Sequence, residues 1–342
     1  MRIILLALVV ACRGGNSPDD DTTTDTTDSS TDTTDSTDTG VTTTTTDTDT
    51  GTVVVWTEES FQAPEAKLED ILFVVDNSCS MSDNQAQMST GMQGFVDTLD
   101  DAGIQWQAGV TSTDMGTRGS PLQGRLVSVG TELWSSPDIA DPAGWLHSAI
   151  QLGVNGAGEE QGIAAAYAAA ELRRTTDNAG FFRDDAGLHV VVLSDEQDQS
   201  DQATPELVPI DDFIDWMEGQ RGPNTSVSFS SFVCVASAAP CQAFDLGTRY
   251  LDVTDAVGGI VWDINDDIDL GVNAVASSIV ANAGFRTLEL ASTPADPAAL
   301  EVTIDGVLLD ASEYSYDVDS NSVVLTDAAP DGADIVVRWP EA

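Results

Sequence analysis

Basic residues are scarce in this 342-residue chain. It has 12 Lys and Arg residues against 58 Asp and Glu residues, which gives a formal net charge of −46. A chain this acidic repels phosphate backbones and anionic lipid headgroups, so the charge argues against nucleic-acid binding and against electrostatic docking on a membrane. The imbalance favours solubility and carries no information about the fold.

Histidine and lysine are nearly absent. The chain has two histidines, His147 and His189, and one lysine, Lys67. Two isolated histidines argue against a His-rich metal site and against a Ser/His/Asp hydrolase. The sequence also has no nucleophile elbow and no phosphate-binding loop. We therefore predict that the protein is not an enzyme; a metal-assisted hydrolase is the alternative.

The apolar run at the N-terminus, residues 3–11, is too short to cross a bilayer, which takes about 20 residues in a helix. It follows Arg2 and ends in Val9-Val10-Ala11-Cys12, which resembles a bacterial lipoprotein signal. The resemblance implies that Cys12 is lipidated and becomes the mature N-terminus, with an ordinary signal peptide as the alternative. We therefore expect an extracytoplasmic protein, lipid-anchored at the outer membrane or cell surface.

The residues that follow the signal, 13–55, have the composition of a linker. Between 16 and 52 nearly every residue is Asp, Thr or Ser, and Val41 is the one large apolar side chain. Such a segment cannot bury enough surface to offset its ordering entropy, so we predict a disordered linker that lifts a folded domain off the membrane. A calcium-binding or glycosylated tract is the alternative.

Between about 70 and 285 the sequence alternates strand-like and helix-like segments. Strands are predicted at 70–76, 104–110, 125–129, 188–193, 226–234 and 259–262. Helices are predicted at 82–100, with Ser82 as the N-cap, and at 159–174, 206–220 and 268–283. This alternation indicates an α/β domain over 56–285, with a doubly wound, mostly parallel sheet covered by helices on both faces.

The last stretch, 286–342, has a different pattern. Apolar residues recur at strand period, and Asp305-Gly306 between two such runs predicts a tight hairpin turn. We predict a small C-terminal all-β domain resembling a sandwich, packed against the main domain.

Polar side chains follow two of the predicted buried strands. Asp76-Asn77-Ser78-Cys79-Ser80 comes directly after the first, and Ser194-Asp195-Glu196 comes directly after the strand at 188–193. Ligands of parallel α/β sheets bind at the carboxyl ends of the strands. Carboxylate and hydroxyl oxygens suit a hard cation such as Mg²⁺.

These two segments resemble the metal-ion-dependent adhesion site of von Willebrand factor type A (VWA) domains, over about 70–285. The resemblance implies that Asp76, Ser78, Ser80 and Asp195 hold Mg²⁺ or Ca²⁺, and that the cation binds a protein ligand through an acidic side chain. An Asp/Ser helix-capping turn in another doubly wound domain is the alternative.

The family's usual threonine in the loop before the third helix has no counterpart here. That region reads Gly156-Ala-Gly-Glu159-Glu160-Gln161. Either Glu159 or Glu160 could replace the hydroxyl, which would favour Ca²⁺ or a closed structural site and weaken the attraction for an acidic ligand. The two acids could instead only stabilise a helix N-terminus.

The motif variants, together with Cys12 and the Thr/Asp tract, resemble a bacterial subgroup of these domains in surface lipoproteins with low-complexity stalks. We therefore predict a membrane-anchored protein that mediates cation-dependent protein binding or adhesion. A structural cell-envelope component with an incidental metal site is the alternative.

Three cysteines remain besides Cys12. Export favours disulfides, and Cys234 and Cys241 are spaced for a local bridge. Cys79 is left inside the predicted metal turn, where we expect a small buried residue, because a soft thiolate ligand would not match a hard-oxygen site.

Overall fold

The computed structural model describes residues 55–116, 121–201, 208–235 and 246–341. All of them belong to one compact unit, 37–342. The predicted signal, Cys12 and most of the predicted linker lie outside the described residues. None of the described helices is both long and apolar enough to cross a membrane.

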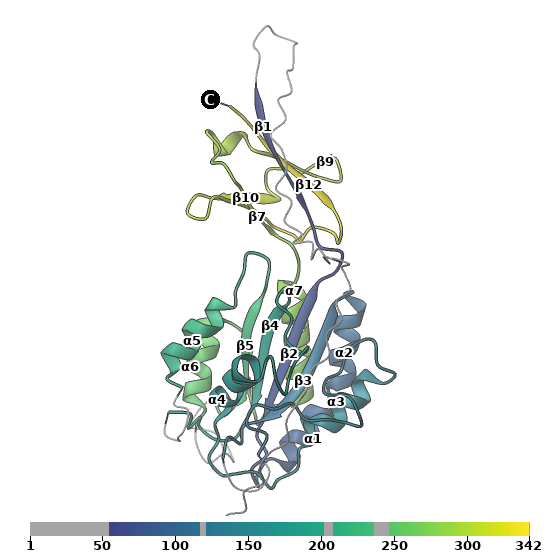
Figure 1. Ribbon diagram of the computed structural model, residues 1–342, viewed down its shortest axis with the longest axis vertical. Coiled ribbons are helices and arrows are strands. Elements are labelled where there is room, and N and C mark those ends of the chain that lie inside the picture. The colour runs from purple at the N-terminus through teal and green to yellow at the C-terminus, as the bar shows by residue number, and fades with distance from the viewer. Residues whose placement is uncertain (1–54, 117–120, 202–207, 236–245, 342) are drawn as a thin grey trace, which may run out of the picture. The chain divides into compact units, whose positions relative to one another are not determined.

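A five-stranded parallel sheet forms the centre of the α/β domain (Figure 1). Its strands run in the order β3-β2-β4-β5-β6, and every neighbouring pair is parallel. The strands are β2 (Leu68–Val75), β3 (Gln105–Ser112), β4 (Gly187–Leu193), β5 (Val227–Val233) and β6 (Val261–Asp263). β4 is buried along its whole length, as its continuous apolar sequence requires in a sheet covered on both faces. The predicted α/β fold class is confirmed.

One predicted strand is wrong. Residues 125–129 do not form a strand; Val127 N donates a single hydrogen bond to Val110 O of β3, and Val129 only bridges to Glu132 in a local turn. A strand pair needs a series of backbone hydrogen bonds, so a segment that makes only one does not extend the sheet beyond β3.

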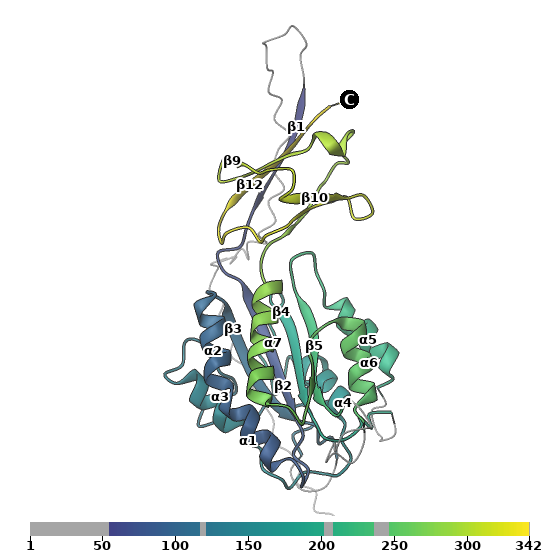
Figure 2. The same ribbon diagram turned by 180° about the vertical axis from the view of Figure 1, so that it is seen from behind.

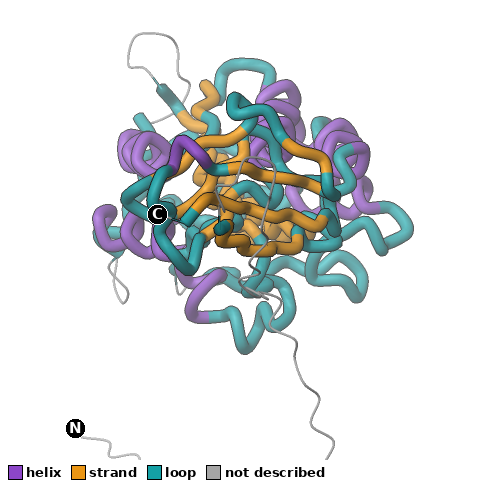
Figure 3. Tube along the Cα trace, turned by 90° about the horizontal axis from the view of Figure 1, so that it is seen from above, coloured by secondary structure: helices purple, strands orange, loops and turns teal. Residues whose placement is uncertain are grey.

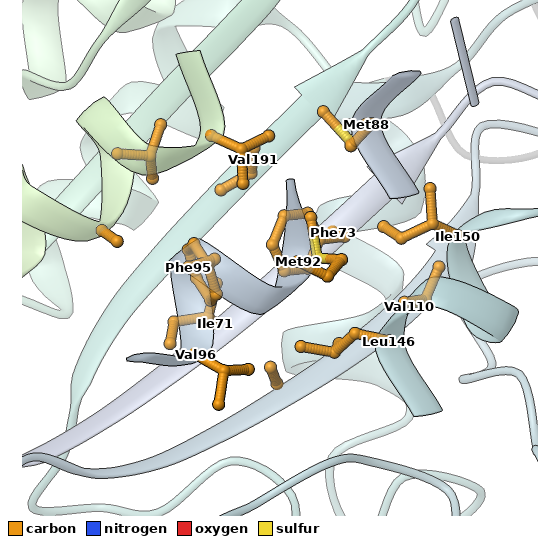
Figure 4. Close-up of a cluster of buried hydrophobic side chains, with 14 of the residues drawn as sticks. Ile71, Phe73, Met88, Met92, Phe95, Val96, Val110, Leu146, Ile150 and Val191 are labelled. Carbon is orange, nitrogen blue, oxygen red and sulfur yellow. The ribbon is translucent and has the colours of Figure 1, made fainter. Parts of the chain in front are cut away.

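Four helices cover one face of the sheet, as Figure 2 shows from behind. They are α1 (Ser82–Thr90), α2 (Met92–Asp101), α3 (Pro142–Ile150) and α7 (Ile268–Asn282). Their apolar side chains meet those of β2 and β3 in a buried cluster, where Phe73 packs edge-on against Phe95 at 5.5 Å between ring centroids (Figure 4). Burial of each large apolar side chain in such a cluster contributes about 1.5–3 kcal/mol.

The predicted helix over 82–100 is divided in two at Gly91. At this point α7 passes so close that a Cβ on Gly91 would lie 3.0 Å from the Cα of Asp269. The predicted Ser82 cap is also wrong: the N-cap position is Met81, and no side chain caps this helix. Asp141 does cap α3, since its carboxylate accepts a hydrogen bond from Gly144 N at 3.0 Å.

The other helices lie on the opposite face, so that helices flank the strands on both sides (Figure 3). They are α4 (Gly162–Tyr167), the π-helical turn Ala168–Leu172 that continues it, α5 (Ile210–Gly219) and α6 (Thr248–Val257). α4 begins three residues later than predicted, which leaves Glu159 and Glu160 in the loop before it.

Antiparallel strands form a third core. One sheet has the order β1-β12-β8-β9 and another has the order β10-β11-β7. The strands are β1 (Trp56–Gln62), β7 (Thr287–Glu289), β8 (Glu301–Ile304), β9 (Val307–Leu308), β10 (Tyr314–Asp317), β11 (Ser322–Leu325) and β12 (Asp334–Pro340), with a 3₁₀ turn at Pro297–Ala299. The predicted Asp305-Gly306 hairpin joins β8 to β9, and both of its residues have positive φ.

The predicted domain boundary at 56 is wrong for one element. β1 pairs along its whole length with β12, so residues 56–62 belong to the antiparallel sheet rather than to the α/β domain. β1 comes before the α/β domain in the sequence. Its partner β12 comes after that domain, more than 270 residues beyond β1. The α/β domain is therefore an insertion between the first strand and the remaining strands of the β domain.

Candidate metal centre

Asp76 stands at the carboxyl end of β2. Its backbone N–H extends the ladder by donating to Leu193 O of β4 at 2.9 Å, and its side chain is fully buried. One carboxylate oxygen accepts from Ser78 N and the other from Ser194 Oγ, both at 2.7 Å. The second bond connects the 76–80 turn to the loop after β4, because Ser194 directly follows that strand.

The hydroxyls of the turn lie beside the second predicted loop. Ser78 Oγ is 3.3 Å from Ser80 Oγ, and the Ser80 hydroxyl lies close enough to Asp195 to counteract part of the rise in the pKa of that carboxyl. Asp195 is 6 % exposed, and burial raises the pKa of its carboxyl. The structure therefore brings Asp76, Ser78, Ser80 and Asp195 together at one edge of the sheet.

Glu160 completes the group from a third loop. Its side chain is fully buried, one carboxylate oxygen accepts from Thr113 Oγ1, and its backbone carbonyl accepts from Gln199 N at 2.7 Å. Burial and the negative charge of Asp76 raise the pKa of Glu160 to about 9. Glu159, the other candidate, is exposed to solvent, so Glu160 is the glutamate that the structure places beside Asp76.

Gln85 and Gly156 bring the loop before α4 up to the 76–80 turn. The amide of Gln85 donates to Asp76 O at 2.7 Å and to Gly153 O at 2.9 Å, while Gly156 N donates to Asn77 O at 2.8 Å. A Cβ on Gly156 would lie 2.2 Å from the side-chain oxygen of Asn77, so any larger residue here would have to displace the Asn77 amide.

Thr113 and Asp114 were not predicted, and Ser194 was noted only as a polar residue after a strand, with no role in the site. Thr113 and Asp114 follow β3, which adjoins β2 in the sheet, and both are buried. Both Asp114 oxygens accept backbone N–H groups, from Gly116 at 2.9 Å and from Ala157 at 3.2 Å, so this carboxylate holds loops together. The position of these residues at the end of a strand was the available signal. A single polar residue after a strand is common, however, and only the strand order shows that these strands end beside β2.

The donor set fits a hard divalent cation. One oxygen of Glu160 and one of Asp195 are buried without a hydrogen-bond donor. No Arg, Lys or His among the described residues forms an ion pair with Asp76, Asp195 or Glu160. Buried carboxylates without a counter-charge are costly, and oxygen-coordinated Ca²⁺ or Mg²⁺ would supply that charge.

Carboxylates alone do not form a metal cage here. Within the described ranges no three Asp, Glu, His or Cys side chains converge closely enough to hold a metal ion by themselves. The serine hydroxyls of the 76–80 turn, together with water, would have to complete the coordination, as is common for Mg²⁺ in particular.

The cysteines are placed as follows. Cys79 is a free thiol and is exposed, so the expectation of a small buried residue is wrong; of its neighbours in the turn, Ser78 is buried and Ser80 is half-buried. Cys234 takes part in a disulfide. Cys241, its predicted partner, lies outside the described residues.

Neither a protein-family model nor a curated protein matches the chain. Among solved structures it is similar to the pilus adhesin SpaC from Lactobacillus rhamnosus GG, with a TM-score of 0.40 and 12 % identity over 84 % of this chain and 41 % of that one. It is also similar to proximal thread matrix protein 1 from the mussel byssus, with a TM-score of 0.38 and 12 % identity over 64 % and 49 % of the two chains. This chain thus spans less than half the length of either structure, and we draw no functional conclusion from similarities at this level.

Proposed function

We propose that this protein is an extracytoplasmic binding protein whose α/β domain, of the VWA type, holds a divalent cation at the 76–80 turn and uses it to bind a partner protein. The observation that carries the proposal is that Asp195 and Glu160, from two other loops, each lie beside the buried Asp76 and each keep one buried oxygen that has no donor. Asp76, Ser78, Ser80, Asp195 and Glu160 would hold the cation. When bound, Ca²⁺ or Mg²⁺ would act as a Lewis acid that accepts an oxygen ligand from the partner.

Glu160 also favours a second candidate, a closed structural site. Three carboxylates carry one more negative charge than a divalent cation neutralises, so an acidic side chain of a partner would be attracted less strongly than by a site with a neutral hydroxyl in that position. In this case the cation would connect the three loops and stabilise the fold. Ca²⁺, which accepts more oxygen ligands than Mg²⁺, would then be preferred.

Capture from the native envelope separates the two candidates. The full chain is immobilised with Ca²⁺ or Mg²⁺, or with a chelator, and Asp76→Asn is treated in parallel. The binding proposal predicts a protein that is retained by the wild type with cation and is lost both with chelator and with Asp76→Asn. The structural candidate predicts an increase in thermal stability with cation and no cation-dependent partner.

The anchor remains a proposal as well. We propose that Cys12 is lipidated and that the acidic 13–55 segment separates the folded domains from the outer membrane, a reading that depends on the Val9-Val10-Ala11-Cys12 pattern. Palmitate labelling of the wild type and of Cys12→Ser tests it: label that persists in the variant would contradict the assignment.

A further inference from the structure

A cavity of about 350 Å³ opens at the amino ends of β4 and β5, at the end of the sheet opposite the candidate metal centre. Its walls differ in charge from the rest of the chain. Asp and Glu make up 58 of the 342 residues, yet none of the 18 described residues that line the cavity is acidic. Two of them are arginines, Arg221 and Arg286, and seven carry hydroxyl or amide side chains.

Neither arginine forms an ion pair with any carboxylate of the described residues. Arg221 donates from Nη2 to Val257 O at 2.9 Å, and Arg286 donates to Thr326 O at 2.7 Å and to Ala281 O at 3.1 Å. These acceptors are neutral carbonyls, and a guanidinium has five N–H donors, so each side chain keeps donors for a ligand.

Such arginines are the exception in this molecule. Five other arginines of the described ranges pair with a carboxylate: Arg173, Arg174, Arg183, Arg249 and Arg338. The third described arginine without an ion pair, Arg125, donates to Pro121 O and does not line this cavity. The cavity therefore has two arginines without an ion pair to a described residue and no acidic residue in its lining.

The buried carboxylate of Glu69 forms hydrogen bonds with two residues that line the cavity. It accepts from His189 Nε2 at 2.7 Å and from Ser226 Oγ at 3.0 Å, and it does not line the cavity. Since a carboxylate only accepts, Nε2 of His189 donates to Glu69, and Nδ1 lies 2.8 Å from Ser228 Oγ. The one ion-pair partner of Glu69 among the described residues is therefore His189, and its carboxylate is not paired with either arginine.

The second arginine is held in place through its backbone. The side-chain oxygen of Asn224 accepts from both Arg286 N and Thr287 N at 2.8 Å, and its amide donates to Thr287 O at 2.9 Å. These hydrogen bonds of the Asn224 amide fix the backbone at Arg286, so less conformational freedom is lost there when a ligand binds.

We propose that this cavity binds a small oxyanionic molecule, one that carries a carboxylate or a phosphate group, between Arg221 and Arg286. Guanidinium groups match both kinds of oxyanion with paired N–H donors. The volume lies within the range of small-molecule sites, about 300–1,000 Å³. The site is independent of the metal centre, because no residue is shared between them.

Calorimetry of the full chain with inorganic phosphate and with citrate tests the proposal. The protein is first freed of divalent cations, so that the metal centre takes no part and the outcome does not depend on the proposed function. We expect saturable binding of at least one probe that weakens as NaCl is raised. Arg221→Gln should weaken it at least tenfold, whereas Arg125→Gln, which removes the same charge from an unpaired arginine elsewhere, should leave it unchanged.

A second readout guards against misfolding of a variant. Amide resonances of Gly258 and Gly259, which line the cavity, should shift on titration of the wild type and not of Arg221→Gln. Binding of citrate alone or of phosphate alone supports the proposal and identifies the oxyanion. Absence of binding by both probes, or an equal loss in Arg125→Gln, would overturn it.

Discussion

Glu160 is the residue whose chemistry most needs explanation. It is fully buried, its charge lies beside that of Asp76, and one of its oxygens has no donor. Without a cation, the raised pKa of about 9 means that Glu160 holds its proton at neutral pH. With a cation the same group would be ionised, so Glu160 is a sensitive reporter of the metal centre.

Replacing Glu160 by glutamine should weaken cation binding. Glu160→Gln removes a charged ligand at constant shape, so we expect an affinity at least tenfold lower, about 1.4 kcal/mol, with the larger loss for Ca²⁺. Competition with a chromophoric chelator measures it. The exposed neighbour provides the control, since Glu159→Gln should bind as the wild type does. Equal affinities of the two variants would remove Glu160 from the site.

Asp70 provides a pH dependence far from the metal centre. It is 2 % exposed at the amino end of β2, and its carboxylate accepts from Arg183 N at 2.6 Å and from Arg183 Nε at 2.8 Å. Burial outweighs these bonds and raises the pKa of Asp70 from 3.8 to about 6. The folded state therefore holds a proton between these two values that the unfolded state has already released.

From this shift, the free energy of unfolding should fall as pH rises from about 4 to about 6, with a contribution from Asp70 of about 3 kcal/mol that is present below the unfolded pKa and lost above the folded one. Asp70→Asn removes the titration and keeps an acceptor for Arg183. Urea unfolding of the cation-free wild type and variant at several pH values measures the difference. Parallel curves would show that the pKa of Asp70 is the same in both states.

At the scale of single residues, the sequence predicts those members of the cluster that belong to a local pattern along the chain. Asp76, Ser78 and Ser80 form a motif within one turn, and Asp195 follows a continuous apolar strand. Thr113 and Ser194 could not be predicted, because their role depends on which strands are adjacent in the sheet. The exposed position of Cys79 was also missed, since residue spacing in a turn does not determine which side chains point inward.

The N-terminus of α4 is the element that positions Glu160. Three of its backbone N–H groups donate to side chains: Gly162 to Tyr250 OH at 3.2 Å, Ile163 to Asp198 at 3.1 Å and Ala164 to Ser200 Oγ at 2.9 Å. Two of these acceptors lie in the loop that also carries Asp195. The loop after β4 therefore holds both a candidate ligand and the start of the helix that follows Glu160.

Loss of the buried acceptor should affect stability and cation binding together. Asp198 is fully buried and also accepts from Arg249 Nε at 3.0 Å, so Asp198→Ala leaves Arg249 Nε and the helix amide of Ile163 without their acceptor and should cost about 3–5 kcal/mol. Chemical denaturation and a calcium titration of the same samples measure both effects. Asp201→Ala is the matched control, because Asp201 pairs with the same arginine from the surface and should cost less than about 1 kcal/mol. Similar losses in the two variants would contradict this account.

Strands could be predicted more reliably than helix boundaries. Continuous apolar runs identified β2 and β4, because a strand buried on both faces favours such a composition. The break at Gly91 depends on the close passage of α7, which is a tertiary contact and leaves no local pattern. Residues 125–129 have strand composition, but they make only one ladder bond with β3.

On the scale of the whole molecule, the pairing of β1 with β12 determines the domain organisation. The first and last strands of the described chain lie side by side (Figures 1 and 2). Partners so far apart in sequence are invisible to periodicity, which explains why the boundary at 56 was misplaced while the β domain at 286–342 was predicted. The acidic residues that give the net charge of −46 are also unevenly distributed. None of the described residues that line the cavity at Arg221 and Arg286 is acidic.

The central claim is that Asp76 and its neighbours hold one divalent cation, and calorimetry of the full chain with Ca²⁺ and with Mg²⁺ tests it most directly. We expect one cation per chain in the wild type and no measurable binding in Asp76→Asn, which removes the charge while an amide oxygen remains to accept from Ser78 N. The chelated wild type and variant should unfold at similar temperatures, because the turn lies outside the apolar core. Unchanged stoichiometry and affinity in Asp76→Asn, or absence of binding by the wild type, would contradict the account.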